Sequence, residues 1–216
     1  MSAKIFAIGD IHGCYRNLAQ LVDRLPFDPQ WDTLVFLGDY INRGPQSREV
    51  VDFVLNLQAS CARTVFLLGN HEHALLNYAA TGDVETLHLL RGMGVEATLA
   101  SYGGAPIRSL LDLSFLPAAH LDFLHSLQLS FRADPYLFVH ADAEIEAGDA
   151  RPIAQLLASR RLATDCPRPD GCVVVFGHTA FQTPLVAPGR IGIDTGAVHG
   201  NVLTALELPR LRFHHA

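Results

Sequence analysis

The segment Ile5–Phe6–Ala7–Ile8–Gly9–Asp10–Ile11–His12–Gly13 joins a short apolar run to side chains that bind metals. Runs of β-branched and aromatic residues of this length are typical of buried strands. A similar arrangement, an apolar run that ends beside Gly or His, recurs four times. The four segments are Leu34–Val35–Phe36–Leu37–Gly38–Asp39, Val65–Phe66–Leu67–Leu68–Gly69–Asn70–His71–Glu72, Leu137–Phe138–Val139–His140 and Val173–Val174–Val175–Phe176–Gly177–His178. With helical segments between several of them, these strands predict an α/β fold.

Polar side chains at the ends of these strands are candidates for one shared site, because open α/β sheets gather ligands at the carboxyl ends of their strands. Asp10 and His12 stand two residues apart, so in an extended segment they project to the same side and can hold one ion. Asp39 has two oxygens and can bridge two ions. The candidate metal ligands are Asp10, His12, Asp39, Asn70, His140 and His178.

This donor set predicts both the metal and the reaction. Mixed oxygen and nitrogen donors without a thiolate favour Mn²⁺, Fe or Zn²⁺ over Mg²⁺ or Ca²⁺, and we expect two divalent ions with Mn²⁺ as the first choice. Two ions about 3.5–4 Å apart can share a bridging hydroxide for in-line attack on phosphorus. His71 and Arg43, each close to a ligand, are candidates to protonate the leaving oxygen and to bind the phosphoryl oxygens. A lone Gly-Asp after a strand is usually only a turn, so the prediction depends on the whole set.

Length and composition indicate one globular domain. The chain has 216 residues, of which 49% are apolar and 18% charged, so we expect a single domain over 1–216 with a sizeable core. The net charge of −6 argues against a nucleic-acid or anionic-membrane surface. It does not argue against an anionic substrate, because bound divalent cations invert the local field.

The cysteines show no metal-binding or disulfide pattern. Cys14, Cys61, Cys166 and Cys172 lack a C-x-x-C spacing, and no signal-peptide or membrane-spanning stretch is evident. We therefore expect reduced thiols and a cytoplasmic protein, and we expect it to be a monomer.

The order of the elements follows from periodicity and helix stops. Helical spacing after Gly13, after Pro45 and from 71 to 80 predicts three helices between the first strands. From 84 to 129 the pattern is helical with breaks, which predicts a helical insert beside the sheet. Further strands are expected at 136–139, 172–176, 190–194 and 202–208, with one helical piece at 153–162.

Taken together, the motifs resemble those of the calcineurin-like metallophosphoesterases, and within them the phosphoprotein phosphatases of compact bacterial and phage type. The segments that carry the resemblance are Gly9–Asp10–Ile11–His12–Gly13, Gly38–Asp39–Tyr40–Ile41–Asn42–Arg43–Gly44, Gly69–Asn70–His71–Glu72, His140–Ala141, Gly177–His178–Thr179, Ala97–Thr98–Leu99–Ala100–Ser101–Tyr102–Gly103 and Ile193–Asp194–Thr195–Gly196–Ala197–Val198. The resemblance implies two packed mixed β-sheets flanked by helices, with a dinuclear site at the strand ends.

The resemblance also implies roles for individual residues. Asp10, His12 and Asp39 would bind the first metal, and Asp39, Asn70, His140 and His178 the second. His71 would be the general acid and Arg43 a phosphate clamp. The family's second phosphate-binding arginine lies in a Trp-x-Arg context, for which Arg160 is the best match although Ala158 replaces the Trp.

Asn42 departs from the family pattern, which has an aspartate that orients and charges the histidine acid. An amide can accept a hydrogen bond from His71 but cannot stabilise imidazolium by charge. A non-acidic residue here resembles the symmetrical diadenosine tetraphosphate hydrolases, which remain the alternative. Gly177–His178–Thr179 in place of Gly-His-Trp, Glu72 in place of Asp, and a shorter spacing between the last two histidine ligands favour the phosphatase.

We expect a phosphomonoesterase, specifically a serine/threonine protein phosphatase, that acts on a phosphorylated protein or small phosphoester. The 141–171 loop has no aromatic residue to stack a base. Its acids Glu144, Glu146, Asp149 and Asp165 would repel a polyphosphate. A catalytically silent phosphate-binding or scaffolding protein is disfavoured, because all the metal-ligand positions are filled.

Overall fold

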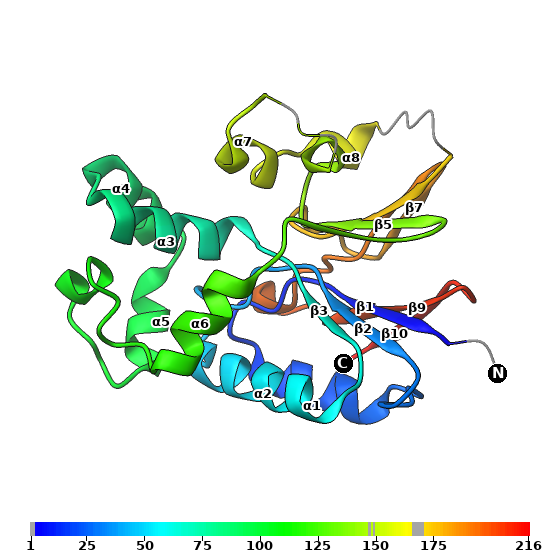
Figure 1. Cartoon of the computed structure of the whole chain (residues 1–216), viewed down its shortest axis with the longest axis horizontal. Helices are drawn as coiled ribbons and strands as arrows, with labels where there is room; N and C mark the ends of the chain where they lie inside the picture. The colour runs from blue at the N-terminus through cyan, green and yellow to red at the C-terminus, as the bar shows by residue number, and fades with distance from the viewer. Residues whose placement is uncertain (1–2, 147, 149, 166–170) are drawn as a thin grey trace.

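The computed structural model describes residues 3–146, 148, 150–165 and 171–216. Its core is a pair of five-stranded sheets packed face to face, with helices on the outer faces (Figure 1). This confirms the expected α/β fold with two mixed sheets flanked by helices.

The first sheet holds the strands of the first three motifs and the last strands of the chain. Its members are β1 (Ile5–Ile8), β2 (Thr33–Phe36), β3 (Thr64–Phe66), β9 (Thr204–Leu208) and β10 (Arg212–His215), in the spatial order β10-β9-β1-β2-β3. β1, β2 and β3 pair in parallel, whereas β9 is antiparallel to both β1 and β10. The ligand-bearing ends of β1–β3 therefore share one edge.

The second sheet brings the two histidine motifs to the same region. Its members are β4 (Ser130–Ala133), β5 (Tyr136–Val139), β6 (Val173–Phe176), β7 (Leu185–Ala187) and β8 (Arg190–Gly192), in the order β4-β5-β6-β8-β7. β5, β6 and β8 are parallel and the two outer strands are antiparallel.

Side chains alternate across each motif strand, as a strand buried on both faces requires. Phe6 and Ile8 pack towards the helices on one side of the first sheet, while Ala7 between them packs against the second sheet. In β5, Phe138 faces the first sheet, and its neighbours Leu137 and Val139 face outward. This apolar packing between the sheets fixes the register of the strands and hence the positions of the residues that follow them.

Helices cover both outer faces and the end where the ligands lie. In Figure 1, α1 and α2 lie beneath the first sheet, α7 and α8 lie above the second, and α3 to α6 gather at the end of the molecule away from the N-terminus. Their bounds are α1 Tyr15–Arg24, α2 Ser47–Ser60, α3 Asn70–Thr81, α4 Val84–Gly92, α5 Val95–Ser101, α6 Ala118–Ser126, α7 Ile153–Leu157 and α8 Arg161–Thr164, with short 3₁₀ turns η1 Ile107–Leu110, η2 Ala143–Ile145 and η3 Ala197–His199.

Several expectations need correction. The single helical piece at 153–162 is two short helices, because the backbone leaves the helical region at Ala158 and Arg160. β8 ends at Gly192 rather than at 194, β9 begins at Thr204 rather than at 202, and the outer strands β4, β7 and β10 were not predicted. Cys14 and Cys61 are free thiols, Cys172 is buried, and Cys166 lies outside the described residues.

Candidate metal centre

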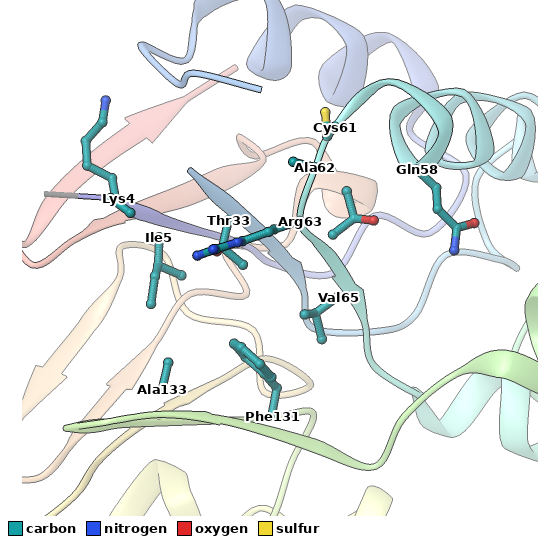
Figure 2. A pocket seen from close by; sticks show the side chains of 12 residues that line it. Lys4, Ile5, Thr33, Gln58, Cys61, Ala62, Arg63, Val65, Phe131 and Ala133 are labelled. Carbon is teal, nitrogen blue, oxygen red and sulfur yellow. The ribbon is translucent and has the colours of Figure 1, made fainter. Parts of the chain in front are cut away.

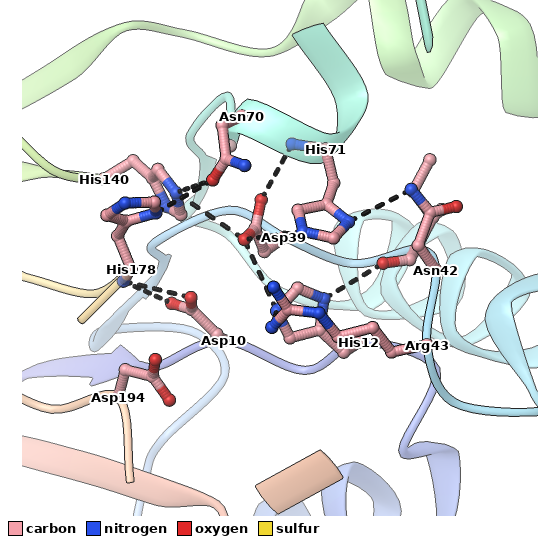
Figure 3. A network of polar contacts seen from close by, with 12 residues as sticks. Asp10, His12, Asp39, Asn42, Arg43, Asn70, His71, His140, His178 and Asp194 are labelled. Atoms are coloured by element: carbon pink, nitrogen blue, oxygen red, sulfur yellow. Dashed lines mark hydrogen bonds and ion pairs between the residues drawn. The ribbon is translucent and has the colours of Figure 1, made fainter. Parts of the chain in front are cut away.

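The structure brings the predicted ligands together from both sheets. Asp10, Asp39 and Asn70 follow β1, β2 and β3, while His140 and His178 follow β5 and β6 (Figure 3). Two sets of donor atoms lie within 4.8 Å of one another: those of His12, Asp39 and His71, and those of Asp39, His140 and His178. Asp39 belongs to both sets, so its carboxylate sits where a bridging ligand would be required.

Asp39 lies at the centre of the cluster and is almost completely buried. Its Oδ2 is 3.4 Å from His12 Nε2 and 3.7 Å from His140 Nε2, while Oδ1 accepts a hydrogen bond from the backbone N–H of His71 at 3.1 Å. One carboxylate oxygen therefore faces two imidazoles, and the other helps to orient the start of α3.

Backbone carbonyls fix which ring nitrogen each histidine turns towards the centre. His12 Nδ1 donates to the Ile41 carbonyl at 3.1 Å, and His140 Nδ1 donates to the Leu37 carbonyl at 2.8 Å. Each neutral ring then presents the lone pair of Nε2 to the site. Such partners on the far nitrogen are typical of metal-binding histidines.

His178 uses the opposite nitrogen. Its ring is hydrogen-bonded to the backbone of Ala158, which leaves Nδ1 facing inward, 2.9 Å from Asn70 Oδ1. Because Ala158 ends α7, its carbonyl is outside a continuous helix and is free to accept this bond. The break between α7 and α8 thus provides the backbone acceptor that orients the His178 ring.

The convergence of acceptors around Asn70 supports a cation at this point. Asn70 Oδ1 lies 2.9 Å from His140 Nε2 and 2.9 Å from His178 Nδ1, and in the tautomers fixed by the carbonyls neither nitrogen carries a proton. Lone pairs that meet at such distances repel unless a positive charge lies among them. The donors present therefore fit a divalent metal with oxygen and imidazole ligands.

Burial of several carboxylates in one place leads to the same conclusion. Burial raises the pKa of Asp39 to about 7. Burial and the neighbouring Asp194 carboxyl raise the pKa of Asp10 well above its usual range. Burial and the Arg43 charge lower the pKa of His12 to about 3, and burial lowers that of His140 to about 4. A bound cation would favour the ionised carboxylates and the neutral imidazoles, and would so offset the cost of burying these carboxylates.

Asp10 is held differently from the other predicted ligands. Its two oxygens lie 3.0 and 3.1 Å from the backbone nitrogen of His178. This hydrogen bond links the end of β1 in the first sheet to the end of β6 in the second. Among the described residues, the two clusters of donor atoms do not include Asp10, so its role as a ligand stays a prediction.

His71 is buried between Asp39 and Asn42 (Figure 3). Asn42 Nδ2 lies 3.0 Å from His71 Nδ1, while Asn42 Oδ1 accepts a hydrogen bond from Thr98 Oγ1 at 2.7 Å. The expectation that the Asn42 amide accepts a hydrogen bond from His71 is therefore wrong. Thr98 already occupies the oxygen, so the NH₂ group faces the ring.

The two predicted arginines are both exposed at the rim. Arg43 Nη1 lies 2.9 Å from His12 Nε2, and the Arg43 backbone N–H donates to the Gly94 carbonyl of the 84–129 segment at 3.3 Å. Arg160 is the N-cap residue of α8, and its charge helps to lower the pKa of His178, after the larger effects of burial and of His140. Arg43 thus contacts the cluster directly and Arg160 acts on it electrostatically, and the roles of both in binding a phosphoryl group stay predictions.

The backbone at the site adopts conformations that are rare for side-chain-bearing residues. Of the seven non-glycine residues with positive φ among those described, five are predicted site residues, namely His12, Asp39, Asn42, Arg43 and His178. Gly69 and Gly177 permit the close packing of these turns, because a Cβ at either position would collide with the carboxylate of Asp39 or Asp10. Strain of this kind concentrates at functional sites.

Glu72 and Asp194 belong to the site although no role was predicted for them. The Glu72 carboxylate accepts four backbone hydrogen bonds: Oε1 from Tyr40 (2.9 Å) and Ile41 (3.1 Å), and Oε2 from Asp39 (3.0 Å) and Gly69 (3.2 Å). It holds the turn that carries Asp39. Asp194, just beyond β8, is a strand-end carboxylate like Asp39, and that signal in the sequence could have identified it.

Two acidic residues of the 141–171 loop, Glu144 and Glu146, are ion-paired with arginines. Glu144 pairs with Arg151 and, at 2.8 Å, with Arg161, and Glu146 pairs with Arg132 at 2.6 Å. Asp149 lies outside the described residues. The expected repulsion of a polyphosphate by Glu144 and Glu146 is therefore wrong, because each is compensated by a neighbouring arginine.

A cavity of about 650 Å³ lies at the opposite ends of the strands, near Lys4, Thr33, Arg63 and Phe131 (Figure 2). Ile5, Thr33 and Thr64, which line it, are the first residues of β1, β2 and β3, whereas the candidate ligands follow the last ones. The cavity is therefore separate from the candidate site. Among the described residues, none of the helices has the length and apolar character needed to cross a bilayer.

Comparison with known proteins agrees with this geometry. The chain is 30% identical over 233 residues to the asymmetrical bis(5'-nucleosyl)-tetraphosphatase PrpE of Geobacillus thermodenitrificans, covering 94% of this chain and 90% of that protein. A segment of 120 residues, 55% of this chain and 40% of the relative, is 41% identical to the symmetrical bis(5'-nucleosyl)-tetraphosphatase of Aromatoleum aromaticum.

A solved structure shares the fold. The cold-active protein-tyrosine phosphatase of a psychrophilic Shewanella superimposes with a TM-score of 0.64 at 18% identity, over 95% of this chain and 76% of that one. The profile of the family described as calcineurin-like phosphoesterase matches residues 3–182. From these matches and from the cluster at the strand ends, the chain is a member of the calcineurin-like phosphoesterase family and a metal-dependent phosphoric ester hydrolase.

Proposed function

We propose that the protein hydrolyses bis(5'-nucleosyl) tetraphosphates. The observation that carries this proposal is the contact between the Asn42 amide and His71, in a chain whose relatives over nearly its full length are named as tetraphosphatases. Ion pairing of Glu144 and Glu146 weakens the electrostatic objection to a polyphosphate.

The chemistry of the leaving group connects Asn42 to this substrate class. A serine or threonine alkoxide is a strong base and needs a proton as the ester bond breaks, which a charged imidazolium supplies best. A nucleoside phosphate leaves as a weak base and needs little protonation. Asn42 brings no negative charge that would keep His71 protonated, so the pair suits a phosphoanhydride.

Within this proposal His12, Asp39 and Asp10 hold one divalent ion, and Asp39, Asn70, His140 and His178 hold the other, with Mn²⁺ the best match to the donors. The ions, when bound, would neutralise phosphoryl oxygens and lower the pKa of a water for in-line attack. Arg43 binds the phosphoryl group from the side of His12, Arg160 approaches it from the side of His178, and His71 donates a hydrogen bond to the leaving oxygen.

Metal loading should be measurable as thermal stability. We expect Mn²⁺ at about 100 times its Kd to stabilise the metal-free protein by roughly 2.7 kcal/mol, which raises Tm by about 5–10 °C for a chain of this size. Differential scanning calorimetry after chelation and re-addition measures this. Asp112→Asn, an exposed carboxylate outside the site, should keep the full response, whereas Asn70→Ala should lose most of it. If no divalent ion changes the Tm of the metal-free protein, the proposed ligands are wrong.

Product analysis tests the substrate. With diadenosine tetraphosphate we expect ATP and AMP, because the relatives that match over the whole chain carry the asymmetrical designation. ADP alone would indicate the symmetrical mode and leave the substrate class intact. The second candidate, a phosphoserine or phosphothreonine phosphatase, is favoured by Thr179 and Glu72 and by the fold. A kcat/KM at least tenfold higher on phosphopeptides than on the dinucleotide, with the same metal, would replace the proposal with this candidate.

A further inference from the structure

Thr98 on α5 is completely buried, and every donor and acceptor position of its hydroxyl is hydrogen-bonded. Its Oγ1 donates to Asn42 Oδ1 at 2.7 Å, accepts the Asn42 backbone N–H at 2.9 Å and lies 3.1 Å from Ser47 Oγ. A hydroxyl has one proton and two lone pairs, so with Ser47 as the third partner every capacity is filled.

This arrangement determines the orientation of the Asn42 side chain. Because Oδ1 accepts the Thr98 proton, the NH₂ group faces His71 Nδ1, 3.0 Å away. An NH₂ group only donates, so Nδ1 must be the acceptor, and the proton of the neutral ring must reside on Nε2.

The surroundings of Nε2 agree with that assignment. Nε2 is buried, has no hydrogen-bond partner among the described residues, and lies 3.9 Å from Asp39 Oδ2. A proton on Nε2 is attracted to the carboxylate, whereas a lone pair there would be repelled by it.

We propose that Thr98 is a positioning residue which, through the Asn42 amide, holds His71 as a neutral donor whose Nε2–H points at the reacting phosphoryl group. The inference deepens the proposed function and rests on it for the identity of the leaving group. Thr98 and Asn42 are 56 residues apart in sequence, so the relay exists only because α5 packs against the turn after β2. An aspartate at position 42 has no N–H and would impose the opposite tautomer, or an imidazolium, on His71.

Nitrogen NMR of the full-length, histidine-labelled protein tests the tautomer directly and needs no substrate. We expect an unprotonated Nδ1 and a protonated Nε2 for His71 both without metal and with Zn²⁺, assigned by comparison with His71→Asn. Thr98→Val removes only the hydroxyl, so we expect it to shift the ring towards a mixture of tautomers. Thr98→Ser should restore the wild-type pattern. Ser47→Ala is the matched control, because it removes a neighbour of Thr98 without touching the Asn42 side chain.

Kinetics supply a second readout. We expect Thr98→Val to lower kcat by about 10- to 100-fold with KM within about twofold, as for other groups that act through a site residue, and Thr98→Ser to recover most of it. A proton on Nδ1 in the wild type would overturn the proposal. So would a Thr98→Val protein with the wild-type tautomer and kcat. If Thr98→Val does not fold, Thr98→Ala, which also removes the hydroxyl, takes its place, and the same tautomer shift is expected. If His71 has the expected tautomer but the protein does not hydrolyse diadenosine tetraphosphate, only the proposed substrate is disproved.

Discussion

Asp39→Asn should reduce kcat/KM by on the order of 10³-fold, equivalent to about 4 kcal/mol of transition-state stabilisation, because one change weakens both halves of the candidate metal centre. Asp39 is the only residue shared by the two donor clusters found among the described residues, and an amide cannot carry the charge that a bridging ligand supplies. Steady-state kinetics with saturating Mn²⁺ measure the loss, and Asp122→Asn on the exposed face of α6 is the control.

The same variant should not be less stable without metal. The folded-state pKa of Asp39 is raised to about 7, above the roughly 3.9 of an unfolded aspartate, so ionised Asp39 opposes folding at neutral pH. An amide removes that penalty. We expect metal-free Asp39→Asn to melt at or above the temperature of the metal-free wild type while it loses the Mn²⁺ response. A lower melting temperature accompanied by full activity would show that Asp39 is structural and not a ligand.

Glu72→Gln should destabilise the protein by about 3 kcal/mol, the second largest effect that we expect. Each Glu72 oxygen accepts two backbone N–H groups, and a glutamine presents its NH₂ to one of these pairs, leaving two buried donors unpaired. Each unpaired donor costs about 1–3 kcal/mol. Urea unfolding of the metal-free protein measures the change.

The control for Glu72 is an exposed glutamate that makes a side-chain ion pair. Glu96 lies 2.9 Å from Arg91 with both side chains more than half exposed, so Glu96→Gln should cost less than about 1 kcal/mol. Because the Glu72 bonds orient the turn with Asp39, Glu72→Gln should also weaken metal binding. A variant with wild-type stability and metal affinity would mean that the turn holds its shape without the carboxylate.

The sequence predicts the motif strands and their ligands well because the signals are local. An apolar run followed by Gly and a polar side chain identifies both the buried strand and the residue at its end, as for Asp39 after β2. The outer strands were missed for the opposite reason. β10, with the sequence RFHH, has exposed or half-exposed residues only, so it lacks the apolar run by which a buried strand is recognised.

Roles that depend on distant contacts could not be read from the sequence. Glu72 acts on residues 31–33 positions earlier, and Thr98 acts on Asn42 from 56 positions later. The direction of the Asn42 amide depends on which neighbour takes its oxygen, and only the packing of α5 decides that. The pairing of Glu144 with Arg161 likewise changes an apparent acidic patch into a compensated one.

The return of the chain to its first sheet affects when the enzyme becomes competent during synthesis. β1 is made long before its neighbour β9, and His178 follows Asp10 by 168 residues. Until then only His140 of the two second-sheet imidazoles is present to face Asp39 and Asn70. A chain that stops before His178 therefore lacks part of the candidate metal centre, and one that stops before β9 leaves β1 without its antiparallel neighbour.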